Sequence, residues 1–343
     1  MANKFIIPGP PVVGAAASSV ASCDLVVGPR YHVLWLRIKT AATTIPVLST
    51  TLGLIRLKIN GRTQRQMTAL QLNAYNLLWG QQYGAHVTTA ADLNTTVGWI
   101  ESGGLCKTIK SGATADVPNG GLAGTVYSAS SAAHVIHLPI FFAEPWRQQY
   151  AAQDMMALPT AWNGPGAVAT LQLELTLGST AAASGAVVID SEVDYLPGLS
   201  LKDGSPLLLL SKFSQYGMTG FTSADTDNYM TTLPRRDVYQ SIHAFADHAS
   251  DVVSAVKVKL ENNLIRDCNK GRLDQINVSR GCNPLAIHAT RTDIVFDYDD
   301  QPDSGLPMVY NGRQVQDFQL ILQKSAVNVA TASLLAVTFG PLD

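Results

Sequence analysis

The octapeptide ALPTAWNG at residues 157–164 is nearly repeated further along the chain as GLPMVYNG at residues 305–312. Leu, Pro, Asn and Gly recur at a constant separation of 148 residues, and the aromatic Trp162 is matched by Tyr310. A similarity over eight residues can arise by chance in a chain of 343 residues. It indicates a duplicated domain only if the segments around the two octapeptides also recur in the same order.

The flanking segments do recur in the same order. The first half contains PRYHV at the start of an apolar strand, an alternating strand at 55–59, Asn60-Gly61, a helix-like segment, a strand that ends in an acidic residue and proline at 140–145, the octapeptide, and an alternating strand at 171–177. The second half contains PRRDV at the start of a strand, an alternating strand at 256–260, Asn262-Asn263, a polar segment at 264–280, a strand that ends in acidic residues and proline at 294–302, the octapeptide, and an alternating strand at 318–322. The separation falls from 205 residues at PRYHV and PRRDV to 148 at the octapeptides, because the first copy carries a longer insertion. The sequence therefore predicts an internal duplication.

Alternation of apolar and polar residues, the period of a half-buried strand, dominates the chain. LQLELTL at 171–177 is the clearest example, and IRLKI at 55–59 and VKVKL at 256–260 follow the same rule. Clusters of Gly, Asn, Pro and Asp separate these runs, as expected of turns. The pattern predicts an all-β protein of sandwich or barrel type, with helical segments at 62–83 and 206–216.

The predicted domain organisation has four parts. These are an N-terminal arm at 1–27, a first β domain at 28–180 with a long excursion at about 84–133, a linker with a short helix at 181–233, and a second β domain at 234–343. The excursion is rich in Gly, Ala, Ser and Thr, and insertions of this length usually have a function or form a surface. We expect it to reach over a neighbouring molecule or to cover the outer surface.

The N-terminal arm has two interpretations. An apolar stretch followed by VASC resembles a signal peptide with a lipoprotein cleavage box. Pro8-Gly9-Pro10-Pro11 breaks the helix that such a peptide forms, which favours an extended arm. Because Phe5, Ile6 and Ile7 are apolar and the prolines cannot pair in a central strand, we expect the arm to lie outside both β domains and to contact a neighbouring subunit or a membrane.

Composition excludes several classes of protein. Charged residues make up 15% of the chain and the net charge is −2, so the basic excess of a nucleic-acid-binding protein is missing. The sequence has no run of about 20 apolar residues, the length that spans a membrane as a helix. Cys23, Cys106, Cys268 and Cys282 are too widely spaced for a structural zinc site. The low charge and the 46% of apolar residues fit a protein that buries several faces against neighbours.

Catalytic motifs are missing as well. The sequence has no GxSxG, HExxH or GxGxxG. GGLCKT at 103–108 resembles the end of a phosphate-binding loop, but Glu101 and Cys106 stand where that loop needs glycine. His134 and His137 are three residues apart on an expected strand, so their rings point to opposite faces and cannot share a metal. His243 and His248 have no carboxylate nearby in the sequence, although catalytic triads also assemble from distant segments.

One acidic corner is a candidate ion site. Carboxylates gather in the second β domain at Asp297, Asp299, Asp300 and Asp303, and Ca²⁺ accepts such ligands from flexible loops. We take Asp299, Asp300 and Asp303 as the calcium candidates, with a solvated turn as the alternative, since Asp favours turns. The cluster at 225–228 is a weaker candidate, because it lacks the Gly and the closing Glu of a helix-loop-helix calcium motif. We expect that the protein requires no cofactor.

Several of these segments carry a resemblance to a known family. The PRxxV strand, IRLKING, FFAEPW, TLPRRDVYQSIHAF and SAVKVKLENN resemble the major capsid proteins of corticoviruses, which are membrane-containing bacteriophages. The resemblance runs from about residue 30 to residue 339 and rests on strand order and short motifs. It implies a double jelly roll, in which each domain has eight strands in two four-stranded sheets.

The resemblance also implies a function. Three chains would form a homotrimer, a pseudo-hexagonal capsomer of an icosahedral shell around an internal membrane. The expected partners are further copies of the chain, penton and minor capsid proteins, and the underlying viral membrane, without a specific nucleic acid. The protein would be made in the host cytoplasm, would reside in the virion and would catalyse no reaction.

Two other classes remain open from the sequence. A double-barrel enzyme of the bicupin type shares the topology, but it needs clustered His ligands, and the seven histidines here are dispersed without an HxH motif. A tandem carbohydrate-binding or adhesin sandwich would need exposed aromatic platforms. Trp79, Trp99, Trp146 and Trp162 are the candidates for such platforms, and the sequence does not place them inside or outside.

Overall fold

The computed structural model divides the chain into two units, one formed by Met1–Leu210 with Pro341–Asp343 and the other by Ser211–Gly340. Each unit is considered by itself. The structure describes residues 4–42, 44–101, 104–108, 133–161, 167–196, 209–217, 227–230, 233–235, 238–246, 253–261, 263–283, 291–297, 306–307, 309–310, 313–324 and 332–341. None of the helices in these ranges is long and apolar enough to span a membrane.

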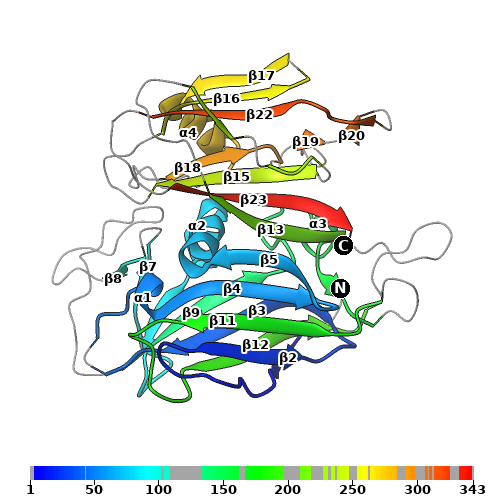
Figure 1. The fold of residues 1–343 in the computed structure, drawn as a ribbon. Coiled ribbons are helices and arrows are strands. Elements are labelled where there is room, and N and C mark those ends of the chain that lie inside the picture. The colour runs from blue at the N-terminus through cyan, green and yellow to red at the C-terminus, as the bar shows by residue number, and fades with distance from the viewer. Residues whose placement is uncertain are drawn as a thin grey trace. The chain divides into compact units, whose positions relative to one another are not determined.

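The first unit is a sandwich of two β layers (Figure 1). One layer runs in the order β1-β12-β3-β9-β6-β7-β8, with β10 paired to β3, and the other contains β5-β4-β11-β2. The strands are β1 (Phe5–Pro8), β2 (Val20–Leu25), β3 (Arg30–Lys39), β4 (Leu52–Ile59), β5 (Arg62–Thr68), β6 (His86–Thr89), β7 (Thr96–Ile100), β8 (Cys106–Thr108), β9 (His134–Phe141), β10 (Leu158–Pro159), β11 (Leu171–Leu177) and β12 (Val187–Asp194). The four leucines of β11 are buried and the residues between them are not, so the alternation seen in the sequence separates core from surface.

Short helices complete the first unit: α1 (Leu48–Thr51), α2 (Ala69–Trp79), α3 (Tyr150–Gln153) and the 3-10 turn η1 (Gln81–Tyr83). The tight hairpin β4–β5 turns at Asn60-Gly61, both with positive φ, which is the backbone that Asn-Gly favours. Helix α2 then starts directly after β5, because Thr68 and Gln71 form a reciprocal capping box.

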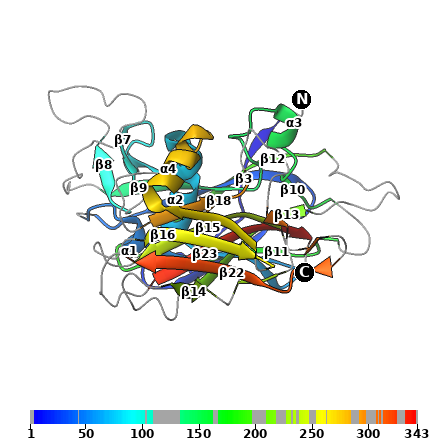
Figure 2. The same cartoon turned by 90° about the horizontal axis from the view of Figure 1, so that it is seen from above.

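The second unit repeats this arrangement. One layer contains β18-β15-β23-β13 with β19 paired to β15, the other runs β14-β22-β16-β17, and β20 pairs with β21. Helix α4 contacts β16, β17 and β18 (Figure 2). The elements are β13 (Leu209–Gly217), β14 (Asn228–Met230), β15 (Val238–Ala246), β16 (Val253–Leu260), β17 (Asn263–Asn269), α4 (Lys270–Ser279), β18 (Arg291–Val295), β19 (Leu306–Pro307), β20 (Val309–Tyr310), β21 (Arg313–Gln314), β22 (Phe318–Lys324) and β23 (Ala332–Pro341).

The predicted duplication is confirmed by strand pairing. Leu158-Pro159 pairs with the start of β3, where Leu158 lies opposite Tyr31, and Leu306-Pro307 pairs with the start of β15, where Leu306 lies opposite Tyr239. The hydroxyl groups of both tyrosines donate to the backbone carbonyl five residues earlier, at 2.6 and 2.7 Å. The two octapeptides therefore begin at equivalent corners of two jelly rolls.

The register of two predicted equivalences was wrong. PRYHV and PRRDV lie 205 residues apart, whereas the structure matches Tyr31 to Tyr239, a separation of 208. The turn Asn60-Gly61 corresponds to Glu261 rather than to Asn262-Asn263, since Asn60 and Glu261 share φ values of 52° and 50° and precede equivalent strands. In both places the similar letters stand a few residues from the equivalent backbone, and the separation of 201 at strands 55–59 and 256–260 is correct.

The N-terminal arm predicted at 1–27 is not separate from the first β domain. Strand β1 pairs with β12, opposite residues 190–193, and β2 pairs with β11. The prolines still act as expected, because Pro8 ends β1 and the chain crosses residues 9–12 without a strand. The apolar residues 5–7 enter an edge strand before the break instead of leaving the domain.

The predicted linker at 181–233 and its helix at 206–216 are also wrong. Residues 187–194 form β12 of the first unit, and LLSKFSQYG at 209–217 is strand β13. Leu210, Ser211, Lys212 and Phe213 are all buried, so the strand reads as a continuous run rather than an alternating one. A short apolar run of this kind cannot be told from a helix by its period. The boundary between units falls at 210/211 instead of within 181–233.

The helix predicted at 62–83 starts later than expected. Residues 62–68 form strand β5, and only 69–79 form α2. Residues 263–280 divide in the same way into β17 and α4. The excursion at 84–133 contains β6, β7 and β8 in its described part, in agreement with the few short strands expected, and residues 109–132 lie outside the described residues.

Candidate functional site

An arginine holds the two layers of the first unit together. Arg65 on β5 is fully buried, and its Nη1 donates to the backbone carbonyl of Phe141 at the end of β9, at 2.6 Å. Its guanidinium also lies 4.6 Å from the ring centre of Phe142, in a cation–π contact. Burial lowers the pKa of Arg65 to about 9, so the guanidinium is still charged at neutral pH.

The second unit carries the same contact. Arg266 on β17 donates from Nη1 to the carbonyl of Val295 at the end of β18, at 2.9 Å, and lies 5.1 Å from the ring centre of Phe296. Arg266 is half-buried, whereas Arg65 is completely enclosed. This repeated contact of guanidinium, carbonyl and phenyl ring is called the arginine clamp below.

Each helix adds an amide next to the clamp. Asn76 on α2 donates from Nδ2 to the carbonyl of Pro139, and Asn277 on α4 donates from Nδ2 to the carbonyl of Asp293, both at 2.9 Å. Both side chains are fully buried. The residues that the duplication places in equivalent positions therefore hold helix, clamp and strand together, and their role in this geometry is structural.

The second unit also contains a serine, a histidine and an aspartate arranged like a catalytic triad. Ser241 Oγ lies 2.8 Å from Nε2 of His243, and Nδ1 of His243 lies 2.6 Å from Oδ1 of Asp293. Arg291 donates to the same Oδ1 at 2.6 Å. The sequence gave no local sign of it, because Asp293 comes 50 residues after His243 and meets it across β15 and β18.

This triad lacks access to a substrate. Ser241 and His243 have no exposed surface, and Asp293 and Arg291 are 3% and 5% exposed. Burial lowers the pKa of His243 despite the nearby carboxylate of Asp293, which keeps the imidazole neutral near pH 7. Against the opposing effect of burial, the charge of Arg291 and the hydrogen bond of His243 lower the pKa of Asp293 to about 2. The group is thus a buried polar network that orders the core of the second unit.

A second buried histidine network closes one end of the first unit. Nε2 of His32 lies 2.8 Å from Asp194 and its Nδ1 lies 3.2 Å from Asp154, while Arg30 binds both oxygens of Asp194. Burial opposes ionisation of Asp194, but the hydrogen bonds of Arg30 and His32 lower its pKa to about 2. Lys4 lies 3.0 Å from Asp154, so the same network fastens the start of β1.

The histidines of β9 behave as the strand alternation predicts. His134 is fully buried, whereas the half-buried His137 stacks on His86, with ring centres 4.6 Å apart and planes at 4°. Burial is the main cause that lowers the pKa of both stacked rings, that of His137 to about 4. His248 lies outside the described residues.

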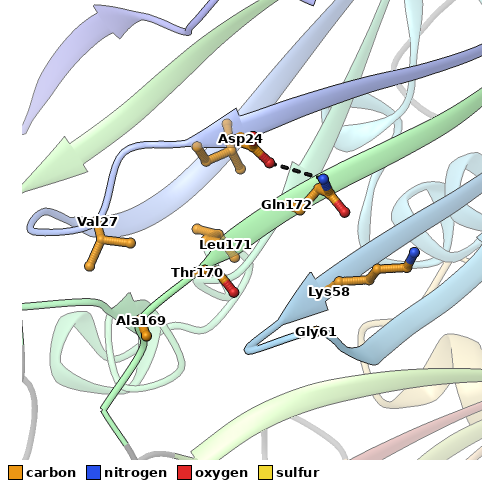
Figure 3. Close-up of a pocket in the computed structure, with 9 residues that line it drawn as sticks. Asp24, Val27, Lys58, Gly61, Ala169, Thr170, Leu171 and Gln172 are labelled. Atoms are coloured by element: carbon orange, nitrogen blue, oxygen red, sulfur yellow. Dashed lines mark hydrogen bonds between the residues drawn. The ribbon is translucent and has the colours of Figure 1, made fainter. Parts of the chain in front are cut away.

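A pocket of about 360 Å³ lies over β2, β11 and β4 of the first unit (Figure 3). Its polar side chains are satisfied by one another, since Gln172 donates to Asp24 at 3.0 Å and Lys58 donates to Glu174. These residues form a row of cross-strand neighbours on the outer face of the sheet. The row stabilises strand pairing and leaves no unpaired charge in this pocket to hold a ligand.

The acidic calcium candidates remain a prediction. Asp299, Asp300 and Asp303 lie outside the described residues, and their neighbour Asp297 is buried. In the weaker cluster, Asp227 accepts hydrogen bonds from Lys257 and Gln323, at 3.0 and 2.9 Å. Across the described ranges no three His, Cys, Asp or Glu side chains lie close enough together to hold a metal ion.

Three of the four candidate tryptophans lie inside the protein. Trp79 and Trp99 are each 8% exposed, and the ring of Trp146 stacks on Trp79 with centres 5.3 Å apart. Trp162 lies outside the described residues. Rings buried against one another do not offer the flat exposed platform that a carbohydrate-binding sandwich needs.

Exposed apolar side chains gather instead on two edge strands. Strand β1 ends one layer of the first unit, and its Phe5 and Ile6 are 50% and 73% exposed. Strand β17 ends one layer of the second unit, and its Leu264 and Ile265 are 51% and 46% exposed. Uncovered apolar edge strands are the usual places where chains pair, so we regard these edges as the candidate functional site.

Comparisons with known proteins agree with this architecture. Residues 6–92 match the family described as viral coat protein P2 N-terminal domain. A search of the curated proteins finds no match. The crystal structure of the major capsid protein P2 from bacteriophage PM2 is similar with a TM-score of 0.65 at 15% identity, covering 99% of this chain and 98% of that chain.

Two further solved structures are similar over nearly the whole chain. The STIV MCP has a TM-score of 0.64 at 10% identity, with 99% of this chain and 97% of that chain covered. The PBCV-1 virus capsid has a TM-score of 0.55 at 11% identity, with 99% and 94% covered. The chain is therefore a double jelly roll with the fold of the PM2 major capsid protein P2, and the resemblance found in the sequence is confirmed.

Proposed function

We propose that this chain is a major capsid protein, a structural subunit of an icosahedral virion shell. The observation that carries the proposal is the likeness to a phage major capsid protein over 99% of this chain and 98% of that one, joined to the coat-protein match over residues 6–92. The buried triad supports a structural rather than an enzymatic role, because its serine has no exposed surface.

The finer assembly is part of the same proposal. Three chains form a homotrimeric, pseudo-hexagonal capsomer, the capsomers form a lattice with penton and minor capsid proteins, and the shell surrounds an internal membrane. Two similar jelly rolls per chain support it, because three such chains give six similar blocks around a closed ring. The buried tryptophans count against the carbohydrate-binding alternative.

Solution mass and electron microscopy test this function. Light scattering of the purified protein at low and high salt is expected to give the mass of three chains, and micrographs are expected to show hexagonal tiles or shells. A monodisperse monomer at high concentration in both salts, with binding to a glycan array, would favour the adhesin alternative.

Calcium is a separate prediction for the acidic corner of the second unit. If Asp299, Asp300 and Asp303 bind Ca²⁺, saturating calcium stabilises the folded protein by about 2–4 kcal/mol, as mass action requires for a ligand at 100–1,000 times its Kd. Calorimetry with Ca²⁺ and with a chelator should then differ in midpoint. Asp299→Asn combined with Asp303→Asn should remove the difference, while an unchanged midpoint in the parent protein would leave the solvated turn.

A further inference from the structure

Equivalent strands of the two units differ in how they are covered. In β5 of the first unit, Gln64, Arg65 and Met67 are 0–3% exposed. In β17 of the second unit, Ile265 occupies the position of Gln64 and is 46% exposed, and Leu264 beside it is 51% exposed. An apolar residue is thus open where its polar counterpart is buried, which is the reverse of what a free surface favours.

The other open edge belongs to the first unit. Strand β1 is paired with β12 on one side only, and Phe5 and Ile6 are more than half-exposed or close to it. Its four residues offer three backbone N–H groups, since Pro8 has none. Pro8 therefore limits any added strand pairing to a short register.

The charges around the two edges are complementary. Next to β1, the single ammonium of Lys4 lies within 3.0 Å of Asp154 and 3.8 Å of Glu192, so this edge carries an excess of carboxylates. On and after β17, Arg266 and the exposed Arg272 outnumber Asp267. Edges of opposite charge attract one another and repel their own kind, which favours contact between unlike edges.

We propose that β17 of one chain joins β1 of a second copy of the same chain by strand addition, with Leu264 and Ile265 packed against Phe5 and Ile6. This inference rests on the proposed function, because it names the surface by which copies of a capsid subunit associate. The contact joins two different patches, so each copy still has one free edge of each kind after a pair forms. Repetition of such a contact closes into a ring when the rotation between copies allows it.

Cross-linking tests which edges meet. Ile6→Cys and Ile265→Cys are introduced together in a Cys268→Ala background, because Cys268 is the only native thiol on these two strands, and the protein is treated with a short bis-maleimide. The double variant should give linked dimers and higher species on denaturing gels. Each single variant alone should give none, whereas an equal mixture of the two single variants should give dimers only.

A charge substitution tests the energetics. Ile265→Lys should raise the concentration at which half of the chains are assembled at least tenfold. Leu93→Lys, at a side chain of matched 45% exposure in the loop between β6 and β7, should leave it unchanged. Circular dichroism and the thermal midpoint of each variant check that it folds like the parent.

The outcomes separate this inference from the function beneath it. If the parent protein assembles while the double variant stays unlinked and Ile265→Lys assembles normally, the edge pairing is wrong and the capsid function stands. If the single variant Ile265→Cys links to itself as efficiently as the double variant, the contact joins like edges and the proposal is overturned. A parent protein that is monomeric under all conditions overturns both.

Discussion

Arg65→Ala is expected to lower the stability of the first unit by about 3–4 kcal/mol, which shifts the thermal midpoint of a domain of this size by roughly 10 °C. The substitution removes the hydrogen bond to the carbonyl of Phe141 and leaves that buried acceptor unpaired, which costs about 1–3 kcal/mol. It also removes the cation–π contact with Phe142 and opens a cavity in the core. Differential scanning calorimetry of the purified protein measures the shift.

The duplication supplies the matched control. Arg266→Ala removes the same contacts in the second unit, but Arg266 is half-buried, so water can replace its hydrogen bond to Val295 and the loss should be about 1 kcal/mol. Arg65→Lys should fall between the parent and Arg65→Ala, because an ammonium can reach the carbonyl but cannot lie flat on the ring. Equal losses for the two alanine variants would mean that burial does not set the strength of the clamp.

The clamp shows what the sequence could have revealed and how it was missed. Arg65 and Arg266, and Asn76 and Asn277, are each separated by 201 residues, the same value as the alternating strands. An arginine followed eleven residues later by an asparagine therefore occurs twice at the predicted separation. A register based on the strands 55–59 and 256–260, rather than on PRYHV and PRRDV, would have aligned them.

Other parts of the fold were not accessible from local pattern. The run at 209–217 has apolar and polar residues buried together, so neither strand nor helix periodicity identifies it. The edge strand at residues 5–8 is too short for a periodic signal, and its partner β12 lies more than 180 residues away. All-β class, duplication and the octapeptide corners were predictable because each rests on a repeated or alternating pattern within the sequence.

The candidate site divides in the same way. Exposure of Ile6 and Ile265 depends on which strands end a layer, and the topology alone decides that. The meeting of Ser241 and His243 follows from strand period, since residues two apart share a face. Their partner Asp293 could not be predicted, because the register of β15 against β18 selects it.

Asp293→Ala is expected to destabilise the second unit by about 3–5 kcal/mol, because it leaves a buried guanidinium without its carboxylate. Arg291 is 5% exposed, and its Nη1 and Nη2 have no hydrogen-bond partner among the described residues, so its charge depends on Asp293. Ser241→Ala is the control within the same network. It removes one neutral hydrogen bond to His243 and should cost only about 1–2 kcal/mol.

The same network makes the second unit sensitive to acid. Folding lowers the pKa of Asp293 to about 2, so its contribution to stability is present above the pKa of the unfolded state, near 3.8, and is lost as the pH falls toward 2. Folding also lowers the pKa of His243, so the unfolded state binds a proton first and stability starts to fall below about pH 6.5. Both groups act in one direction, and the stability of the second unit should decrease continuously from about pH 6.5 to pH 2.

Urea unfolding of the parent and of Asp293→Ala at a series of pH values measures this dependence. The variant should lose the part of the slope below about pH 4, because the carboxylate that produces it is gone. Its difference from the parent should therefore be largest near neutral pH and shrink as the pH approaches 2. In the first unit, Pro139 opposite Trp35 takes the place of Asp293 opposite His243, so the unfolding of that unit should be unaffected by the substitution. A free-energy difference that stays constant across the whole pH range would show that Asp293 acts through packing alone and that its charge contributes nothing to the network.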